Sequence, residues 1–175
     1  MNALKYLRVA VAAMGFAAPA VAQNYPSKTI VMVVPYPPGG SSDTIARIIA
    51  TSMQKTLAQP VVVENTPGAG GTIGTGKVAR ATSDGYSILL HNVGMSTASA
   101  LYRNLAFKTE DLVPIGAVAT VPAILVGRRD LPANNLEELL AYIKKNPSKV
   151  NFGHAGVGSA AHLCGLLFQS AIKMR

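Results

Sequence analysis

A buried strand, a glycine-rich turn and a helix recur in this order along the chain, and this order constrains the fold more than any other feature of the sequence. The first strand is predicted at residues 29–34 (TIVMVV), where apolar and β-branched residues follow one another without a break. Such runs are typical of strands that are covered on both faces. Further strands are predicted at residues 61–63 and 86–90. Strands that alternate with helices indicate an α/β fold with a parallel sheet.

Helices are predicted between these strands from the spacing of apolar residues. Ser41 or Ser42 is expected to cap the first helix, because apolar residues follow at intervals of three and four. The apolar face of this helix comprises Ile45, Ile48, Ile49, Met53 and Leu57. A second helix, weakened by internal glycines, is predicted at residues 72–81. Residues 91–100 are small and polar and give no clear pattern.

A change of composition divides the chain into two predicted domains. Two apolar runs at residues 115–121 and 123–126, separated by Pro122, are expected to be strands that lead out of the first domain. The sequence therefore predicts an α/β domain 1 at residues 23–121 and a partial domain 2 at residues 122–175.

The second domain begins with a helix signal. Asn135 followed by Glu138 is typical of a helix N-terminus, and Leu136, Leu139, Leu140 and Ile143 form the apolar side of that helix. A short strand at residues 150–152 and a helix at residues 160–171 follow. Leu163, Leu167 and Ala171 share one stripe of this last helix. The chain ends where the next strand is expected, so the second domain is predicted to be incomplete.

The first 22 residues have the pattern of a secretory signal peptide. Residues 1–8 carry two positive charges and no negative one, residues 9–21 are mostly apolar, and small residues precede a cleavage point after Ala22. The apolar run is shorter than the about 20 residues needed to cross a bilayer. The mature chain is therefore predicted to be a soluble periplasmic protein.

The net charge bears on the classes of binding partner, and the cysteine content bears on disulfide formation. Removal of residues 1–22 leaves 14 Lys and Arg against 8 Asp and Glu, which lowers the formal net charge from +8 to +6. The positive residues are spread along the chain and form no stripe, so nucleic acid is not an expected partner. Cys164 is the single cysteine, so it is expected to be a small buried residue without an intramolecular disulfide.

Three glycine-bearing turns, at residues 35–43, 66–72 and 153–159, each lie between a predicted strand and a predicted helix. The first turn of a helix leaves about four N–H groups without partners and carries about half a positive charge. A carboxylate or phosphate can bind there without a cationic side chain. The three turns together predict a site that captures an anion.

A nucleotide-dependent α/β enzyme is one alternative. Residues 71–77 fit the pattern GxxxxGK, but Val78 stands where a Ser or Thr must hold magnesium. Residues 156–161 fit GxGxxA, but the acidic residue expected about 20 positions later is missing. Both patterns therefore favour a nucleotide site only weakly.

A serine hydrolase is the other alternative. Ser159 lies near His154 and His162 in the sequence, but the GxSxG pattern of a nucleophile is absent. Ser159 is therefore interpreted as a helix cap and a hydroxyl donor to a ligand. Asp43 is interpreted as a structural or orienting carboxylate in a helix's first turn. No two histidines have the helical spacing of a zinc site, so no metal is expected.

Six short motifs between Tyr25 and the end of the chain are specific in combination. They are YP at residues 25–26, PYPPGGSSD at 35–43, NTPGAGG at 65–71, DGY at 84–86, EDLVPI at 110–115 and GVGSAAHL at 156–163. In these motifs the chain resembles the Bug-type periplasmic solute-binding proteins, the receptors of tripartite tricarboxylate transporters.

This resemblance implies a Venus-flytrap fold of the periplasmic-binding-protein type (type II), which closes over a small carboxylate ligand. The ligand-binding residues that it implies lie in two turns: Tyr36, Pro37, Pro38, Gly39, Gly40, Ser41, Ser42 and Asp43 in the first, and Gly156, Val157, Gly158, Ser159 and the nearby His162 in the second.

The resemblance further implies a receptor rather than an enzyme, with no cofactor and no metal. Its partners would be a small carboxylate and the membrane subunits of a transporter, and the receptor would be a monomer. Receptors of this family are considerably longer, so the chain is expected to be a truncated form. Domain 1 would then lack its C-terminal return.

Overall fold

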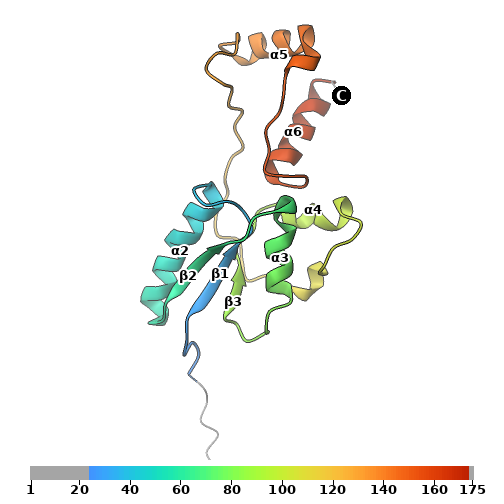
Figure 1. Cartoon of the computed structure of the whole chain (residues 1–175). Coiled ribbons are helices and arrows are strands. Elements are labelled where there is room, and N and C mark those ends of the chain that lie inside the picture. The colour runs from blue at the N-terminus through green and yellow to red at the C-terminus, as the bar shows by residue number, and fades with distance from the viewer. Residues whose placement is uncertain (1–23, 174–175) are drawn as a thin grey trace, which may run out of the picture.

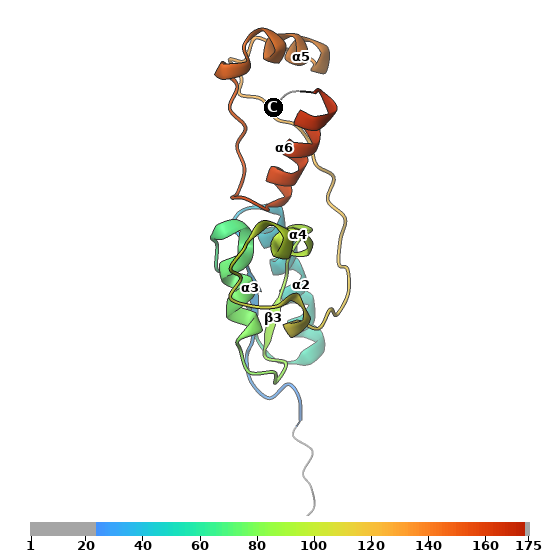
Figure 2. The same cartoon turned by 90° about the vertical axis from the view of Figure 1, so that its right-hand side faces the viewer.

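The structure is a computed structural model that describes residues 24–173, so the predicted signal peptide lies outside the described residues. One part of the molecule is a parallel sheet with helix α2 (Ser41–Leu57) on one face and α3 (Thr72–Ala79) on the other (Figure 1). A separate part contains α5 (Leu136–Lys145) and α6 (Ala160–Ala171), and an extended connection runs between the two parts (Figure 2). The predicted α/β fold with a parallel sheet is confirmed.

The sheet has the order β2-β1-β3, and all its strands are parallel. The strands are β1 (Ile30–Val34), β2 (Val61–Asn65) and β3 (Ser87–Leu89). Ile30 is paired with Val61 on one side, and Val31 is paired with Ser87 on the other. The central strand has neighbours on both edges and helices on both faces, which explains why its residues are uniformly apolar.

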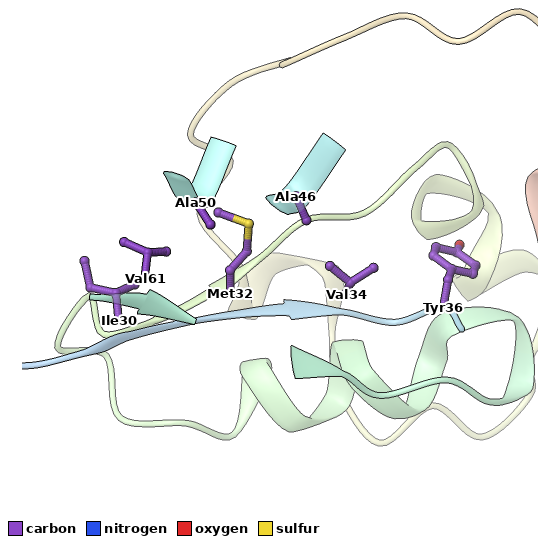
Figure 3. Close-up of a cluster of buried hydrophobic side chains, with 7 residues drawn as sticks. All are labelled: Ile30, Met32, Val34, Tyr36, Ala46, Ala50 and Val61. Carbon is purple, nitrogen blue, oxygen red and sulfur yellow. The ribbon is translucent and has the colours of Figure 1, made fainter. Parts of the chain in front are cut away.

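The core lies between the sheet and α2. Figure 3 shows alternate residues of β1 directed at this helix, followed by the ring of Tyr36 beyond the strand end. The cluster consists of Ile30, Met32, Val34, Tyr36, Ala46, Ala50 and Val61. Alternate residues of a strand share one face, so the same run that forms the core also places Tyr36 at its end.

The buried face of α2 differs from the predicted one. Ala46 and Ala50 are the buried apolar residues of this helix, whereas Ile48 is 65% exposed. Of the predicted face, Ile49, Met53 and Leu57 do pack against the core. The small alanine side chains allow the helix to lie close to the sheet, and this turns Ile48 toward solvent.

The predicted N-caps of α5 and α6 are confirmed, whereas the predicted N-cap of α2 is wrong. Gly40 is the N-cap of α2 without a side-chain bond, and the predicted caps Ser41 and Ser42 are already helical. In α5 the predicted pair is confirmed, because the Glu138 N–H donates to Asn135 Oδ1 at 2.9 Å. Ser159 caps α6, also as predicted.

The remaining elements are short. They are the single-turn 3-10 helices η1 (Ala69–Gly71), η2 (Thr109–Asp111) and η3 (Pro147–Lys149), and the helix α4 (Gly94–Leu101). Helix α4 lies within residues 91–100 and the residue after them, a region where no element was predicted. Within residues 24–173 no helix combines the length and apolar character needed to cross a bilayer.

Three predicted strands are wrong for the described chain. Residues 115–121, 123–126 and 150–152 are not strands in the structure. A strand requires a partner for its backbone groups, and no described strand lies beside these segments. The predicted stripe of α6 is also only partly correct: Leu163 is half-buried, but Leu167 and Ala171 are exposed, and Gly165 packs against Phe152 instead.

Candidate ligand-binding site

The residues that follow the three strands converge at the carboxyl end of the sheet. Tyr36 follows β1, the glycines of η1 follow β2, and His91 and Asn92 follow β3. The hydroxyl of Tyr36 lies 3.2 Å from the position that a Cβ on Gly71 would take. Ligands of open α/β sheets bind outside the carboxyl ends of the strands, so this edge is the candidate site.

Tyr36 is held by the residues that follow β3. Its side chain is 8% exposed, and its hydroxyl donates to Asn92 Oδ1 at 2.8 Å. The same oxygen accepts the Gly94 N–H at 3.0 Å. The His91 ring packs edge-on against Tyr36, with ring centroids 5.4 Å apart. Burial raises the pKa of Tyr36 to about 12, so the phenol stays neutral and places no negative charge at the site.

Asp43 holds the turn after β1 in shape. One carboxylate oxygen accepts the Gly39 N–H at 2.9 Å and Arg47 Nε at 3.0 Å. The other accepts Asn65 Nδ2 at 3.1 Å and lies 2.9 Å from Arg47 Nη2. The hydrogen bond from Arg47, with that from Gly39, lowers the pKa of Asp43 to about 2. Because both oxygens of Asp43 are occupied by donors from the chain itself, this carboxylate orients the turn, as predicted from the sequence.

The turn before α6 is fixed by its own backbone and by two histidines. Ser159 is only 2% exposed, and its hydroxyl accepts the His162 N–H at 3.3 Å. The Gly158 N–H donates to His162 Nδ1 at 3.2 Å, and the Gly156 N–H donates to His154 Nδ1 at 3.1 Å. These bonds shape the turn at the amino end of α6.

This turn meets the sheet-containing part through glycines. The Tyr102 hydroxyl donates to the Val157 carbonyl oxygen at 2.7 Å. A Cβ on Gly94 would lie 2.6 Å from the Gly158 carbonyl oxygen and 3.1 Å from the Tyr36 hydroxyl. Gly70 faces the Val157 carbonyl in the same way. Larger residues at Gly70 and Gly94 would therefore force the turn away from the end of the sheet.

The structure brings together only some of the predicted site residues. Tyr36, Val157 and Gly158 lie around Gly94 and Tyr102, with Gly156 and Ser159 in the same turn. The rest of the first turn lies farther out: Pro37, Pro38, Gly39, Gly40 and Ser41 are exposed, and Ser42 is half-buried. No described residue accepts a hydrogen bond from the Ser41 and Ser42 N–H groups at the start of α2.

Five residues of this region were absent from the predicted set: Gly70, His91, Asn92, Gly94 and Tyr102. Gly70 lies in a turn that the sequence already indicated as anion-binding. His91 and Asn92 directly follow a predicted strand, which is the signal that could have found them. Tyr102 gave no local signal, because its contact with Val157 joins residues 55 positions apart.

This edge of the sheet offers hydrogen-bonding groups of the backbone and of side chains. Among residues 24–173 no group of three or more His, Cys, Asp or Glu side chains could hold a metal. The GxxxxGK match does not form a phosphate-binding loop, because residues 72–79 are helical and Lys77 pairs with Glu64. Ser159 is buried and engaged as a cap, which gives it no exposed position for nucleophilic attack.

Solved structures similar to this chain are solute-binding proteins. The periplasmic binding protein BugD shares 49% identity and a TM-score of 0.83, with 86% of this chain and 51% of that chain covered. MatC from Rhodopseudomonas palustris, solved with bound malate, shares 35% identity and a TM-score of 0.80, over 86% of this chain and 52% of that one. The fold is therefore that of a periplasmic binding protein.

The amino-acid sequence also identifies the protein family. The chain matches the family described as "Tripartite tricarboxylate transporter family receptor" over residues 45–174, and it belongs to this family. A UPF0065 protein of Agrobacterium vitis is 48% identical over 150 residues, and Protein BugT of Bordetella pertussis is 42% identical over 169 residues. The match covers 85% and 95% of this chain but 43% and 52% of those relatives. The chain thus spans about half the length of the curated relatives it matches.

Proposed function

We propose that this chain captures a small carboxylate in the periplasm and serves a membrane transporter of the tripartite tricarboxylate type. The observation that carries the proposal is the meeting of Tyr36 and the turn before α6 around Gly94. The family and the solved relatives support it, since MatC was solved with malate and another R. palustris relative, 29% identical, with adipate.

The ligand would be held chiefly by backbone N–H groups. The amino ends of α2 and α6 both face the boundary between the two parts of the molecule (Figures 1 and 2). Each of these ends favours negative charge through unpartnered N–H groups and the helix dipole. A carboxylate at each end of a dicarboxylate would match two such helix ends, with Tyr36 contributing a neutral hydroxyl between them.

The proposed contacts include residues from both turns. In the first turn the amides of Gly40 to Ser42 would approach the ligand, and Asp43 would orient them through its hydrogen bond with Gly39. In the second turn the Val157 amide would approach the ligand, while Gly156 and Gly158, bonded to His154 and His162, and the cap Ser159 would hold the turn in place. His91 and Asn92 would contribute indirectly, because they hold the Tyr36 side chain in position at the site.

Thermal unfolding with a ligand panel tests the proposal. The panel is malate, adipate and citrate, compared with ATP and NAD. A ligand at about 100 times its Kd stabilises a protein by about 2.7 kcal/mol, so one or more carboxylates should raise the melting temperature by several degrees. A cooperative transition that shifts with no carboxylate, or that shifts with a nucleotide, would contradict the proposal.

Two cap variants form a matched pair for this experiment. Ser159→Ala removes the cap of α6 and Asn135→Ala removes the cap of α5. Each loss should lower stability by about 0.5–2 kcal/mol. Only Ser159→Ala should reduce the shift caused by the carboxylate, because Asn135 caps α5, which lies away from the sheet-containing part (Figure 1). Equal effects of both variants on the shift would count against the site.

A further inference from the structure

The amino end of α2, where a ligand carboxylate is proposed to bind, already holds a negative charge. Asp43 is the third residue of this helix and directly follows the amides of Gly40 to Ser42, which are the proposed ligand contacts. Its side chain is buried. Even at the ordinary pKa of 3.8 this carboxylate would be ionised at neutral pH, and in the folded chain its pKa is about 2. A ligand carboxylate would therefore lie close to a second negative charge.

This charge conflicts with the capture of an anion. Two like charges that are close together and away from bulk water repel each other strongly. A carboxylate in the first turn of a helix also uses part of the positive potential that the helix end offers to a ligand. Asp43 alone would thus weaken the site that its hydrogen bond with Gly39 shapes. A cation that neutralises Asp43 would remove the conflict.

Arg47 is the cation that the structure places on Asp43. It lies one helical turn later, and its guanidinium meets both carboxylate oxygens: Nε donates to Oδ2 at 3.0 Å, and Nη2 lies 2.9 Å from Oδ1. The planar fork of arginine matches a carboxylate in this two-point arrangement. The donors to Asp43 are Gly39, Arg47 and Asn65, and Arg47 is the one among them that carries a charge.

Asn65 keeps the guanidinium of Arg47 on Asp43. Asn65 ends β2, and its Oδ1 accepts Arg47 Nη2 at 3.2 Å. Its Nδ2 donates to Asp43 Oδ1 and to the Tyr36 carbonyl oxygen, each at 3.1 Å. The guanidinium is thus bonded to side chains of both α2 and β2, so it acts on the ligand site through Asp43.

We propose that Arg47 is a positioning residue for carboxylate binding, which neutralises Asp43 so that the amino end of α2 can accept the carboxylate of a ligand. Arg47 lies outside the two turns of the candidate site and was absent from the predicted set of site residues. The inference rests on the proposed function and deepens it, because it names a residue that decides whether the first turn accepts an anion.

Titration calorimetry on charge-matched variants tests this inference. The probe is the carboxylate, among malate, adipate and citrate, that raises the melting temperature of the parent chain most. Arg47→Gln leaves Asp43 without its cation and should raise the Kd by about tenfold or more. Lys28→Gln is the matched control, because it also removes one positive charge and one ion pair, with Asp84, but before the amino ends of β1 and β3. The Kd of this control should stay within about twofold of that of the parent chain.

Two further variants separate the charge of Arg47 from its shape. In Asp43→Asn/Arg47→Gln the negative charge is removed together with its partner, so the Kd should return to within about threefold of that of the parent chain. Arg47→Lys keeps the charge without the fork and should bind at least about threefold more tightly than Arg47→Gln. If Arg47 acts only through shape or by touching the ligand itself, the double variant binds no better than Arg47→Gln, and this result would overturn the inference. Equal Kd values of Arg47→Lys and Arg47→Gln would overturn it as well, and this comparison needs no change at Asp43.

The same titrations distinguish a failure of this inference from a failure of the proposed function. If the parent chain binds none of the three carboxylates, the proposed function is wrong, and the role of Arg47 is wrong with it. If the parent chain binds a carboxylate and Arg47→Gln binds it equally well, only the role of Arg47 is wrong. Thermal unfolding without ligand sets a temperature at which every variant compared is folded.

Discussion

The hydroxyl of Tyr102 donates a hydrogen bond to the carbonyl oxygen of Val157 at 2.7 Å. Tyr102 directly follows α4 in the sheet-containing part, and Val157 lies in the turn before α6. Among the described residues, this is the one side-chain hydrogen bond that holds the turn against the first part of the molecule. The relative position of the two halves of the candidate site therefore depends on this contact and on the glycines around it.

Tyr102→Phe should loosen the turn without unfolding the chain. A hydrogen bond of this kind contributes about 1 kcal/mol, so amide exchange at residues 156–158 should become about fivefold faster, as measured by mass spectrometry. Tyr142→Phe is the control, because the Tyr142 hydroxyl makes no hydrogen bond with the described residues. Unchanged exchange in Tyr102→Phe would show that the contact does not hold the turn.

Gly94→Ala should weaken carboxylate binding. The added Cβ would lie 2.6 Å from the Gly158 carbonyl oxygen, so the turn must move away from Tyr36. We expect the Kd for the carboxylate that raises the melting temperature most, measured by titration calorimetry, to rise by about tenfold or more. Gly116→Ala should have no effect, because a Cβ there meets nothing within 4 Å. Equal affinities of the two variants would refute the role assigned to Gly94.

Asp43 should make the stability of the chain depend on pH in the acid range. Its pKa in the folded chain is about 2, below the ordinary value of 3.8. Folding therefore favours the ionised form, and this contribution is complete above about pH 4 and is lost as the pH falls toward 2. Urea unfolding at several pH values should show this loss in the parent chain and a weaker loss in Asp43→Asn.

The control for Asp43 is Asp130→Asn. Asp130 forms an exposed ion pair with Arg128, and such pairs contribute little to stability. This variant should keep the acid dependence of the parent chain. If the Asp43→Asn variant loses as much stability at acid pH as the parent chain does, then another carboxyl group causes the acid dependence.

Ala46→Leu should destabilise the fold. Ala46 is fully buried between α2 and the sheet, and larger side chains in a packed core typically cost about 1–3 kcal/mol. The free energy of unfolding in urea should fall by this amount. Ile48→Ala on the exposed side of the same helix should change it by less than about 0.5 kcal/mol. A larger loss at Ile48 would mean that α2 packs on the face predicted from the sequence.

The strands and helices of the sheet-containing part could be predicted because their signals are local. An unbroken apolar run such as β1 fits only a strand covered on both faces, and the glycine turns mark its boundaries. The caps of α5 and α6 were equally local, since one side chain reaches an amide three residues away. The two turns of the candidate site were predicted from the motifs that the chain shares with the family.

Most of the errors depend on contacts between residues that are distant in the sequence. Ser41 and Ser42 do not cap α2, and the turn before this helix is held instead by the Asp43 carboxylate, which accepts a hydrogen bond from Asn65, 22 positions away. Ile48 is exposed because two alanines set the distance between helix and sheet. The strands predicted at residues 115–126 lack partners within the described chain, and pairing is a non-local property that no local pattern supplies.

The central claim is that the turns after β1 and before α6 bind one small carboxylate together. Titration of isotopically labelled chain with malate or adipate, followed by amide NMR, tests this claim most directly. The account predicts that the largest shifts occur in both turns, at residues 39–43 and 156–161, at a single ligand affinity. A well-dispersed spectrum in which only one turn responds, or in which the shifts lie around a cavity between α5 and α6, would contradict it.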